Sequence, residues 1–159
     1  MWHALKHNKL GELAHRTITS YFKNDPPTSY QVPFSYHNRT EIQRVLKQAG
    51  FREIKTEVIA KIGKATRAKD VARGLVEGNP VAVAIAKRDP SLLPVITNAM
   101  AAAISRRFGK QNIRAPMRAI VVRACVSESP TQCTKGRHLQ PFWLLPPSFA
   151  EQITLLATL

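Results

Sequence analysis

The chain has 159 residues, of which 44% are hydrophobic and 21% charged, and its formal net charge is +14. This composition excludes a disordered polyelectrolyte, and no run approaches the roughly 20 apolar residues that a membrane-spanning helix needs. The opening residues lack the apolar core of a signal peptide, and two cysteines are too few for a disulfide framework. The sequence therefore predicts a soluble, cytoplasmic protein that makes no membrane contact.

Charge and proline content divide the chain near residue 125. Residues 1–125 contain 22 of the 24 basic and 8 of the 10 acidic residues, whereas residues 126–159 are neutral overall and contain four of the 11 prolines. We expect a folded part over 1–125 and a poorly ordered segment of a different kind over 126–159. The alternative is that the apolar run 142–145 covers an exposed sheet edge of the folded part.

The first half of the folded part is predicted to be helical. Apolar residues recur at helical spacing over 9–22, and the sequence Asp-Pro-Pro at 25–27 ends this helix because proline cannot continue the hydrogen-bond ladder. A second helix is expected to begin at Thr40, which forms a capping-box pattern with Gln43. Gly50 then provides the left-handed residue that commonly ends a helix.

A strand and two short helices are predicted next. Apolar and charged residues alternate over 52–62, which indicates a strand whose even positions, up to Ile62, face inward. Thr66 is expected to cap a short helix. The run 81–86 has no decisive periodicity, and its recurring alanines favour a helix.

A longer helix and a second strand complete the folded part. The helix ends at Phe108 before Gly109, and Pro94 is expected to confine its regular part to the residues after position 93. The run 117–124 is rich in β-branched residues and predicts the second strand. Two strands do not form an independently stable sheet in water, so either helices cover them or they lie at the edge of a larger sheet.

Three segments, taken in order, resemble the C-terminal half of class I S-adenosyl-L-methionine-dependent methyltransferases that act on small molecules, including the ubiquinone and menaquinone biosynthesis type. They are YQVPFSYHNRTEIQRVLKQAGFREIKTEVI, ARGLVEGNPV and APMRAIVVRA. The opening MWHALKHNKLGELAHRTI is similar to the family's segment just after the fifth strand. The resemblance implies a partial Rossmann-like α/β fold, in which 52–62 and 117–124 are the antiparallel last two of seven strands. Residues 66–108 would then form a helical, lid-like insert.

The same resemblance implies S-adenosyl-L-methionine as the cofactor of an intact relative. Such a site needs a glycine-rich turn after the first strand and an acidic residue further on. No two of the seven glycines are separated by a single residue, so the chain contains no G-x-G pattern. We therefore expect it to supply substrate-pocket and lid elements, to bind no cofactor alone, to be inactive alone, and to pair with a missing N-terminal half.

Four residues are candidates for contact with the small-molecule substrate. The resemblance places Trp2 at the mouth of the active site, and it places Phe34, Tyr36 and His37 in a loop on the substrate side of the cleft. A histidine there is suited to act as a general base near neutral pH. The alternatives are that Trp2 belongs to a frayed terminus, and that the three loop residues only pack and cap the helix that follows.

The histidines near the N-terminus do not complete a metal motif. His3 and His7 have the spacing of an H-E-x-x-H motif, but Ala4 occupies the position of the glutamate, and His15 adds no second ligand group nearby. We expect no metal site and assign no catalytic residue.

The excess of basic over acidic residues favours an alternative function, that of a module that binds nucleic acid or an anionic surface. No helix-turn-helix, zinc-finger or aromatic-platform pattern accompanies the charge, so a nucleic-acid partner is not expected. The basic residues form two clusters along the chain, which are Lys61, Lys64, Arg67, Lys69 and Arg73, and then Arg106, Arg107 and Lys110.

Overall fold

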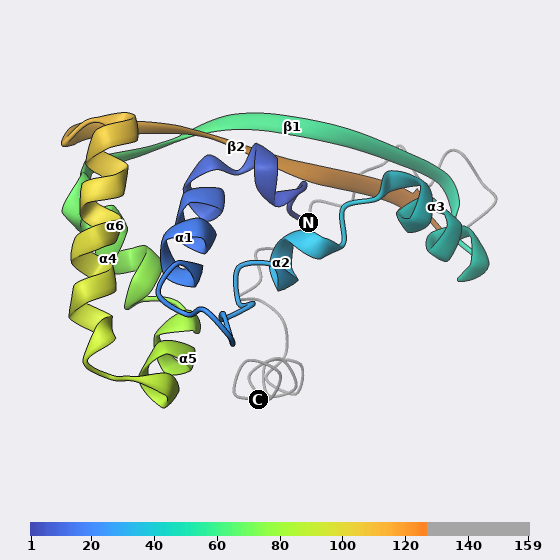
Figure 1. The fold of residues 1–159 in the computed structure, drawn as a ribbon. Helices are drawn as coiled ribbons and strands as arrows, with labels where there is room; N and C mark the ends of the chain where they lie inside the picture. The colour runs from blue at the N-terminus through green and yellow to red at the C-terminus, as the bar shows by residue number, and fades with distance from the viewer. Residues whose placement is uncertain (127–159) are drawn as a thin grey trace, which may run out of the picture. The chain divides into compact units, whose positions relative to one another are not determined.

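The computed structural model describes residues 1–126, and within them Met1–Ala124 forms one compact unit (Figure 1). The second unit, Cys125–Leu159, lies almost wholly outside the described residues, as do the expectations made for 126–159. The fold is of the mixed α/β class and consists of helices and one two-stranded antiparallel sheet. Its elements are η1 (Leu5–His7), α1 (Lys9–Thr19), α2 (Val32–Ser35), α3 (Arg39–Gln48), β1 (Arg52–Arg67), α4 (Ala68–Val76), α5 (Val81–Arg88), α6 (Leu92–Phe108) and β2 (Gln111–Cys125).

The order of the predicted elements is confirmed, while several boundaries differ. Helices α4, α5 and α6 lie between the two strands, and the ambiguous run 81–86 is helical. Thr66 does not cap α4, because it continues β1 and no side chain caps that helix. Pro94 lies inside the first turn of α6. Backbone N–H groups in the first turn have no intrahelical acceptor, so a proline there removes no hydrogen bond from the helix. The first helix ends at Thr19, well before the prolines at 25–27.

One hydrophobic core joins the helices at one end of the strands. Helix α6 packs against α1, α4 and α5, and Figure 1 shows these four helices grouped below the same end of the long strands. The apolar residues of α4 and α6 recur every three or four positions, so each helix turns one face to this core. The most buried members are Ala14, Ile18, Ala72, Val76, Val81, Ile85, Ile96, Met100, Ile104 and Ile113.

The strand pair buries opposite faces at its two ends. Near the helical core the buried positions are odd-numbered, such as Ile113 and Ala115 on β2. Beside α3, which packs against β1, they are even-numbered, because Ile120 is buried and Thr56 accepts a hydrogen bond from Gln43 on α3. Since successive side chains alternate between faces, the buried face of the ribbon changes along its length, and the strong twist typical of two-stranded ribbons accounts for this change.

This twist corrects the prediction for the first strand. The expected even-numbered inward face extended to Ile62, but the Ile62 side chain is 48% exposed. Alternation alone assumes one buried face, and the face that the ribbon buries changes before residue 62.

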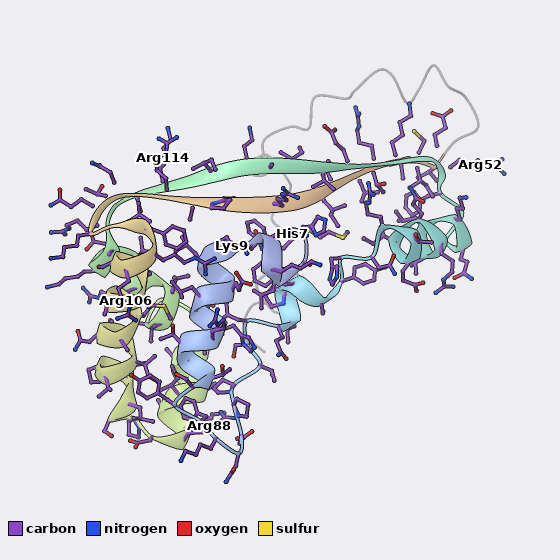
Figure 2. All side chains as sticks on the ribbon, turned by 45° about the horizontal axis from the view of Figure 1, so that its top comes forward. His7, Lys9, Arg52, Arg88, Arg106 and Arg114 are labelled. Carbon is purple, nitrogen blue, oxygen red and sulfur yellow. The ribbon has the colours of Figure 1, made fainter. Side chains whose placement is uncertain are left out.

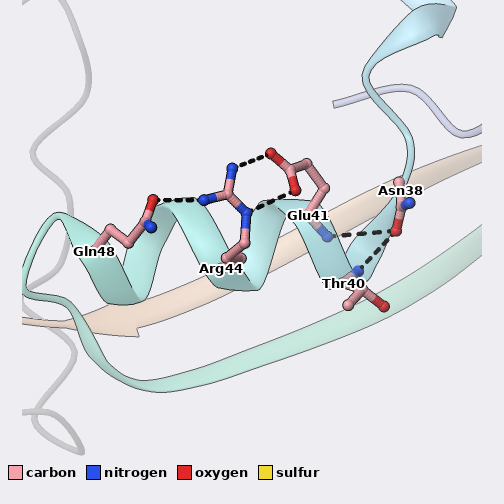
Figure 3. A network of polar contacts seen from close by, with 5 residues as sticks. All are labelled: Asn38, Thr40, Glu41, Arg44 and Gln48. Atoms are coloured by element: carbon pink, nitrogen blue, oxygen red, sulfur yellow. Dashed lines mark hydrogen bonds and ion pairs between the residues drawn. The ribbon is translucent and has the colours of Figure 1, made fainter.

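The start of α3 differs from the predicted capping box. The N-cap is Asn38, whose Oδ1 accepts hydrogen bonds from the backbone N–H groups of Thr40 (3.0 Å) and Glu41 (3.4 Å) (Figure 3). Thr40 is already helical, and Gln43 is bonded to Thr56 instead of reaching back to the cap. At the other end of this helix Gly50 has a φ of 86°, as predicted for a left-handed cap.

The first three residues pair with β2. Trp2 forms an antiparallel bridge with Ala119, and backbone hydrogen bonds link Met1 to Ile120 and His3 to Arg118. A single isolated bridge, flanked by these backbone hydrogen bonds, therefore joins the N-terminal segment to β2. Among the described residues no helix is both long and apolar enough to cross a membrane.

Candidate functional site

An apolar pocket of about 390 Å³ lies between the N-terminal segment, α2 and the strand pair. Its volume falls in the range of small-molecule sites, which are commonly apolar with a few polar groups. The pocket is lined by Trp2, Asn8, Leu10, Gly11, Ser29, Tyr30, Pro33, Phe34, Gly63, Leu75, Asn79, Ala115, Pro116 and Met117.

Two of the four predicted substrate residues meet at this pocket. The rings of Trp2 and Phe34 both line it, and their centroids are 6.1 Å apart in a tilted arrangement. The pairing of Trp2 with Ala119 holds the backbone of Trp2 against β2, so the frayed terminus weighed for this residue is not observed. The two aromatic side chains thus form one apolar wall of the pocket.

The other two predicted residues do not line the pocket. Tyr36 is 48% exposed. His37 is held by a 2.8 Å hydrogen bond between its Nδ1 and the carbonyl oxygen of Phe34, and a carbonyl can only accept, so Nδ1 carries the proton. Helix α3 is capped by Asn38 and not by His37.

Asn8 is the buried polar residue of this pocket, with 5% of its surface exposed. Its Oδ1 accepts a 3.0 Å hydrogen bond from the Arg118 backbone N–H. Its Nδ2 donates to the carbonyl oxygens of His3 (3.1 Å) and Ala4 (3.3 Å). The Asn8 side-chain amide therefore ties the N-terminal segment to β2. Because its oxygen and nitrogen are engaged in these bonds, the amide has little capacity left to bond a ligand in the pocket.

Tyr30 contributes a ring to the pocket and uses its hydroxyl elsewhere. The hydroxyl donates a 2.6 Å hydrogen bond to the Leu75 carbonyl oxygen, and the residue is buried. Burial raises the pKa of Tyr30 well above its ordinary value, so the phenol stays protonated at neutral pH. It is a structural donor and is unsuited to act as a base.

Three imidazoles gather outside the pocket lining. The His3 ring lies 4.5 Å from that of His7 and 6.2 Å from that of His37, and the His3 Nδ1 accepts a 2.7 Å bond from the Ala4 N–H. Burial first, and then the neighbouring charge of His7, lower the pKa of His3; burial and the Arg118 charge lower that of His7. Over residues 1–126, no group of three His, Cys, Asp or Glu side chains is placed to hold a metal ion.

The lining of the pocket offers contacts for binding and no group for proton transfer. Its lining contains no carboxylate, imidazole or amine, so it offers no group that exchanges protons near neutral pH. Ser29 and Asn79 are the polar side chains at its boundary besides Asn8 and Tyr30. The arrangement suits a largely apolar small molecule with few polar atoms.

Sequence reasoning missed most of this pocket, although one residue carried a usable signal. Gly63 lies inside β1, and a glycine in a strand interior often marks a close approach of backbone or ligand. A Cβ built at this position would reach the Met117 Sδ at 3.4 Å, across the pocket lining. Asn8 and Tyr30 had no such signal, because their roles depend on residues far along the chain.

Comparison with known proteins provides no family assignment. No protein-family model matches the chain. No curated protein matches its sequence significantly either.

Proposed function

We propose that this chain forms the substrate-binding part of a class I S-adenosyl-L-methionine-dependent methyltransferase that acts on an apolar small molecule. The Rossmann-like sheet, the cofactor and the methyl-transfer activity all belong to this proposal. The observation that carries it is the strand arrangement at the N-terminus.

The pairing of Met1–His3 with β2 supports the proposed fold. The resemblance places these residues just after a fifth strand, which belongs to the same sheet as the last two strands. A fifth strand next to that edge would pair with one of them. Trp2 does so with Ala119, and β2 thereby lies between β1 and the N-terminal segment.

The helical insert supports the assignment of substrate binding. Helices α4, α5 and α6 lie between the two strands, and Leu75 of α4 and Asn79 after it border the pocket. The pocket thus lies between the insert and the segment that follows the proposed fifth strand. An insert in this place can enclose a substrate and exclude water from it.

The described residues do not fit the cofactor itself. The ribose and ammonium groups of S-adenosyl-L-methionine call for carboxylates, and the pocket lining has none. The full sequence also contains no G-x-G turn. The proposal therefore assigns cofactor binding to residues outside this chain and derives no chemical step from the residues described.

Substrate binding is tested by filling the pocket. The Gly63→Val variant places a side chain in the pocket, and the nearest atom to the new Cβ stays at 3.4 Å. We expect saturation-transfer NMR to detect 2-naphthol on the wild-type chain and to lose the signal in this variant. The control is Gly74→Val on α4, where a Cβ meets nothing within 4 Å. Equal binding to both variants would contradict the pocket assignment.

The family assignment has a separate test. We expect the transcript to continue in frame upstream of Met1 and to encode a glycine-rich strand-turn-helix. The product of that longer frame should bind S-adenosyl-L-methionine in equilibrium dialysis, whereas the 159-residue chain should not. A stop codon directly upstream of Met1, or micromolar binding by the 159-residue chain alone, would overturn the assignment.

A further inference from the structure

A second concave site, separate from the apolar pocket, lies where the start of α4, the last turns of α6 and the start of β2 meet. This basic groove has a volume of about 580 Å³. Four basic side chains line it, which are Arg67, Lys69, Arg106 and Lys110. Small side chains such as Ala101 and Ala102 of α6 form an apolar floor between them. No acidic residue is among the lining residues.

The positive charge of the basic groove is largely uncompensated. Arg67 pairs with Asp70 through Nε at 2.8 Å, and Asp70 does not line the groove. Within residues 1–126, Lys69, Arg106 and Lys110 have no carboxylate within ion-pair distance. Cations that line one groove without counter-charges favour an anion bound between them.

The fold brings together two basic clusters that are distant in the sequence. The Ala68 N–H donates a 3.0 Å hydrogen bond to the Lys110 carbonyl oxygen, which joins the start of α4 to the segment after α6. Arg106 lies in the last turn of α6 (Figure 2) and lines the same groove as Lys69 and Lys110.

We propose that the basic groove binds a small organic molecule that carries two or more phosphate groups. Lysine and arginine side chains are the usual partners of phosphate, and several of them around one cavity suit a multiply charged anion. The volume is that of a small-molecule site, and the alanine floor can accept an apolar body. The lining contains no aromatic side chain on which the bases of a nucleic acid could stack.

Calorimetric titration of the purified chain with inorganic pyrophosphate and with ATP tests this proposal. We expect both probes to bind, and ATP to bind more tightly because it adds a third phosphate and a body that can contact the floor. Lys69→Ala, Arg106→Ala and Lys110→Ala should each weaken ATP binding by at least about fivefold, since each removes a charged partner of the phosphates. Far-UV circular dichroism checks that these exposed substitutions leave the fold unchanged.

The matched control is Lys87→Ala on α5, which removes the same charge from an exposed position outside the groove. We expect it to change the dissociation constant less than twofold. Absence of binding of both probes, or an equal loss in Lys87→Ala, would overturn the proposal. Tight binding of a single-stranded oligonucleotide without any binding of pyrophosphate would also overturn it, and would favour a nucleic-acid partner. None of these outcomes depends on the apolar pocket or on the methyltransferase assignment.

Discussion

Replacing Asn8 by aspartate should detach the N-terminal segment from β2. The substitution keeps the shape of the side chain and the acceptor for the Arg118 N–H, but it removes the two donor bonds to His3 and Ala4. At neutral pH it also places a carboxylate oxygen next to two carbonyl oxygens, at a position only 5% exposed. The variant therefore isolates the role of a single –NH₂ group.

The cost follows from these contacts. Each lost hydrogen bond is worth about 1 kcal/mol. Within residues 1–126 the His3 carbonyl accepts no other hydrogen bond, whereas the Ala4 carbonyl keeps a bond from the His7 N–H at 2.9 Å. Burying the carboxylate against these carbonyl oxygens adds roughly 2 kcal/mol or more. We expect the free energy of unfolding to fall by about 4 kcal/mol in total.

Urea denaturation followed by far-UV circular dichroism measures this change. With a slope of about 2 kcal/mol per molar urea, the midpoint should fall by roughly 2 M. Because burial raises the pKa of the new aspartate in the folded state, it binds a proton more readily when folded, and the deficit should shrink as the pH falls towards about 4. Asn24→Asp, at an exposed bend, serves as control. A loss below about 1 kcal/mol in Asn8→Asp would refute the reasoning.

Three further outcomes are expected. Asn38→Ala should lower the free energy of unfolding by about 1 kcal/mol in urea denaturation, and Thr40→Ala by less than about 0.5 kcal/mol. A larger loss in Thr40→Ala than in Asn38→Ala would support the predicted capping box instead. Ile120→Ala should cost about 3 kcal/mol and Ile62→Ala about 1 or less in the same assay, since their side chains are 1% and 48% exposed; equal losses would contradict the twisted ribbon. Because the folded-state pKa of His3 is lowered, the unfolded chain binds protons first, so the melting temperature should be level above about pH 6.5 and fall below it. His3→Asn should flatten this dependence, and an unchanged slope would assign it to other groups.

Local sequence patterns were sufficient for much of the secondary structure. Helical spacing of apolar residues predicted α1, α3 and α6, and the glycines at 50 and 109 ended two of these helices with positive φ angles of 86° and 91°. Such signals are local, because a helix turns one face inward whichever partner it meets, and glycine alone adopts those angles without strain. The order of strand, helical insert and strand was predicted for the same reason.

The tertiary structure decided which surfaces these elements share. Trp2 and Phe34 could be selected as site residues from the sequence, but the wall formed by Gly63 comes from β1, which is distant from both of them in the sequence. The alternation in β1 predicted a strand, and only the twist of the pair determined that Ile62 is exposed.

The net charge of +14 shows the same division between sequence and structure. The sequence alone determined how many basic residues the chain has and that they fall into two clusters. It did not determine that Lys69 and Arg106 line one groove, because that depends on how α4 packs against α6. Local periodicity fixes which residues a helix can present, whereas packing between distant segments decides what those residues face.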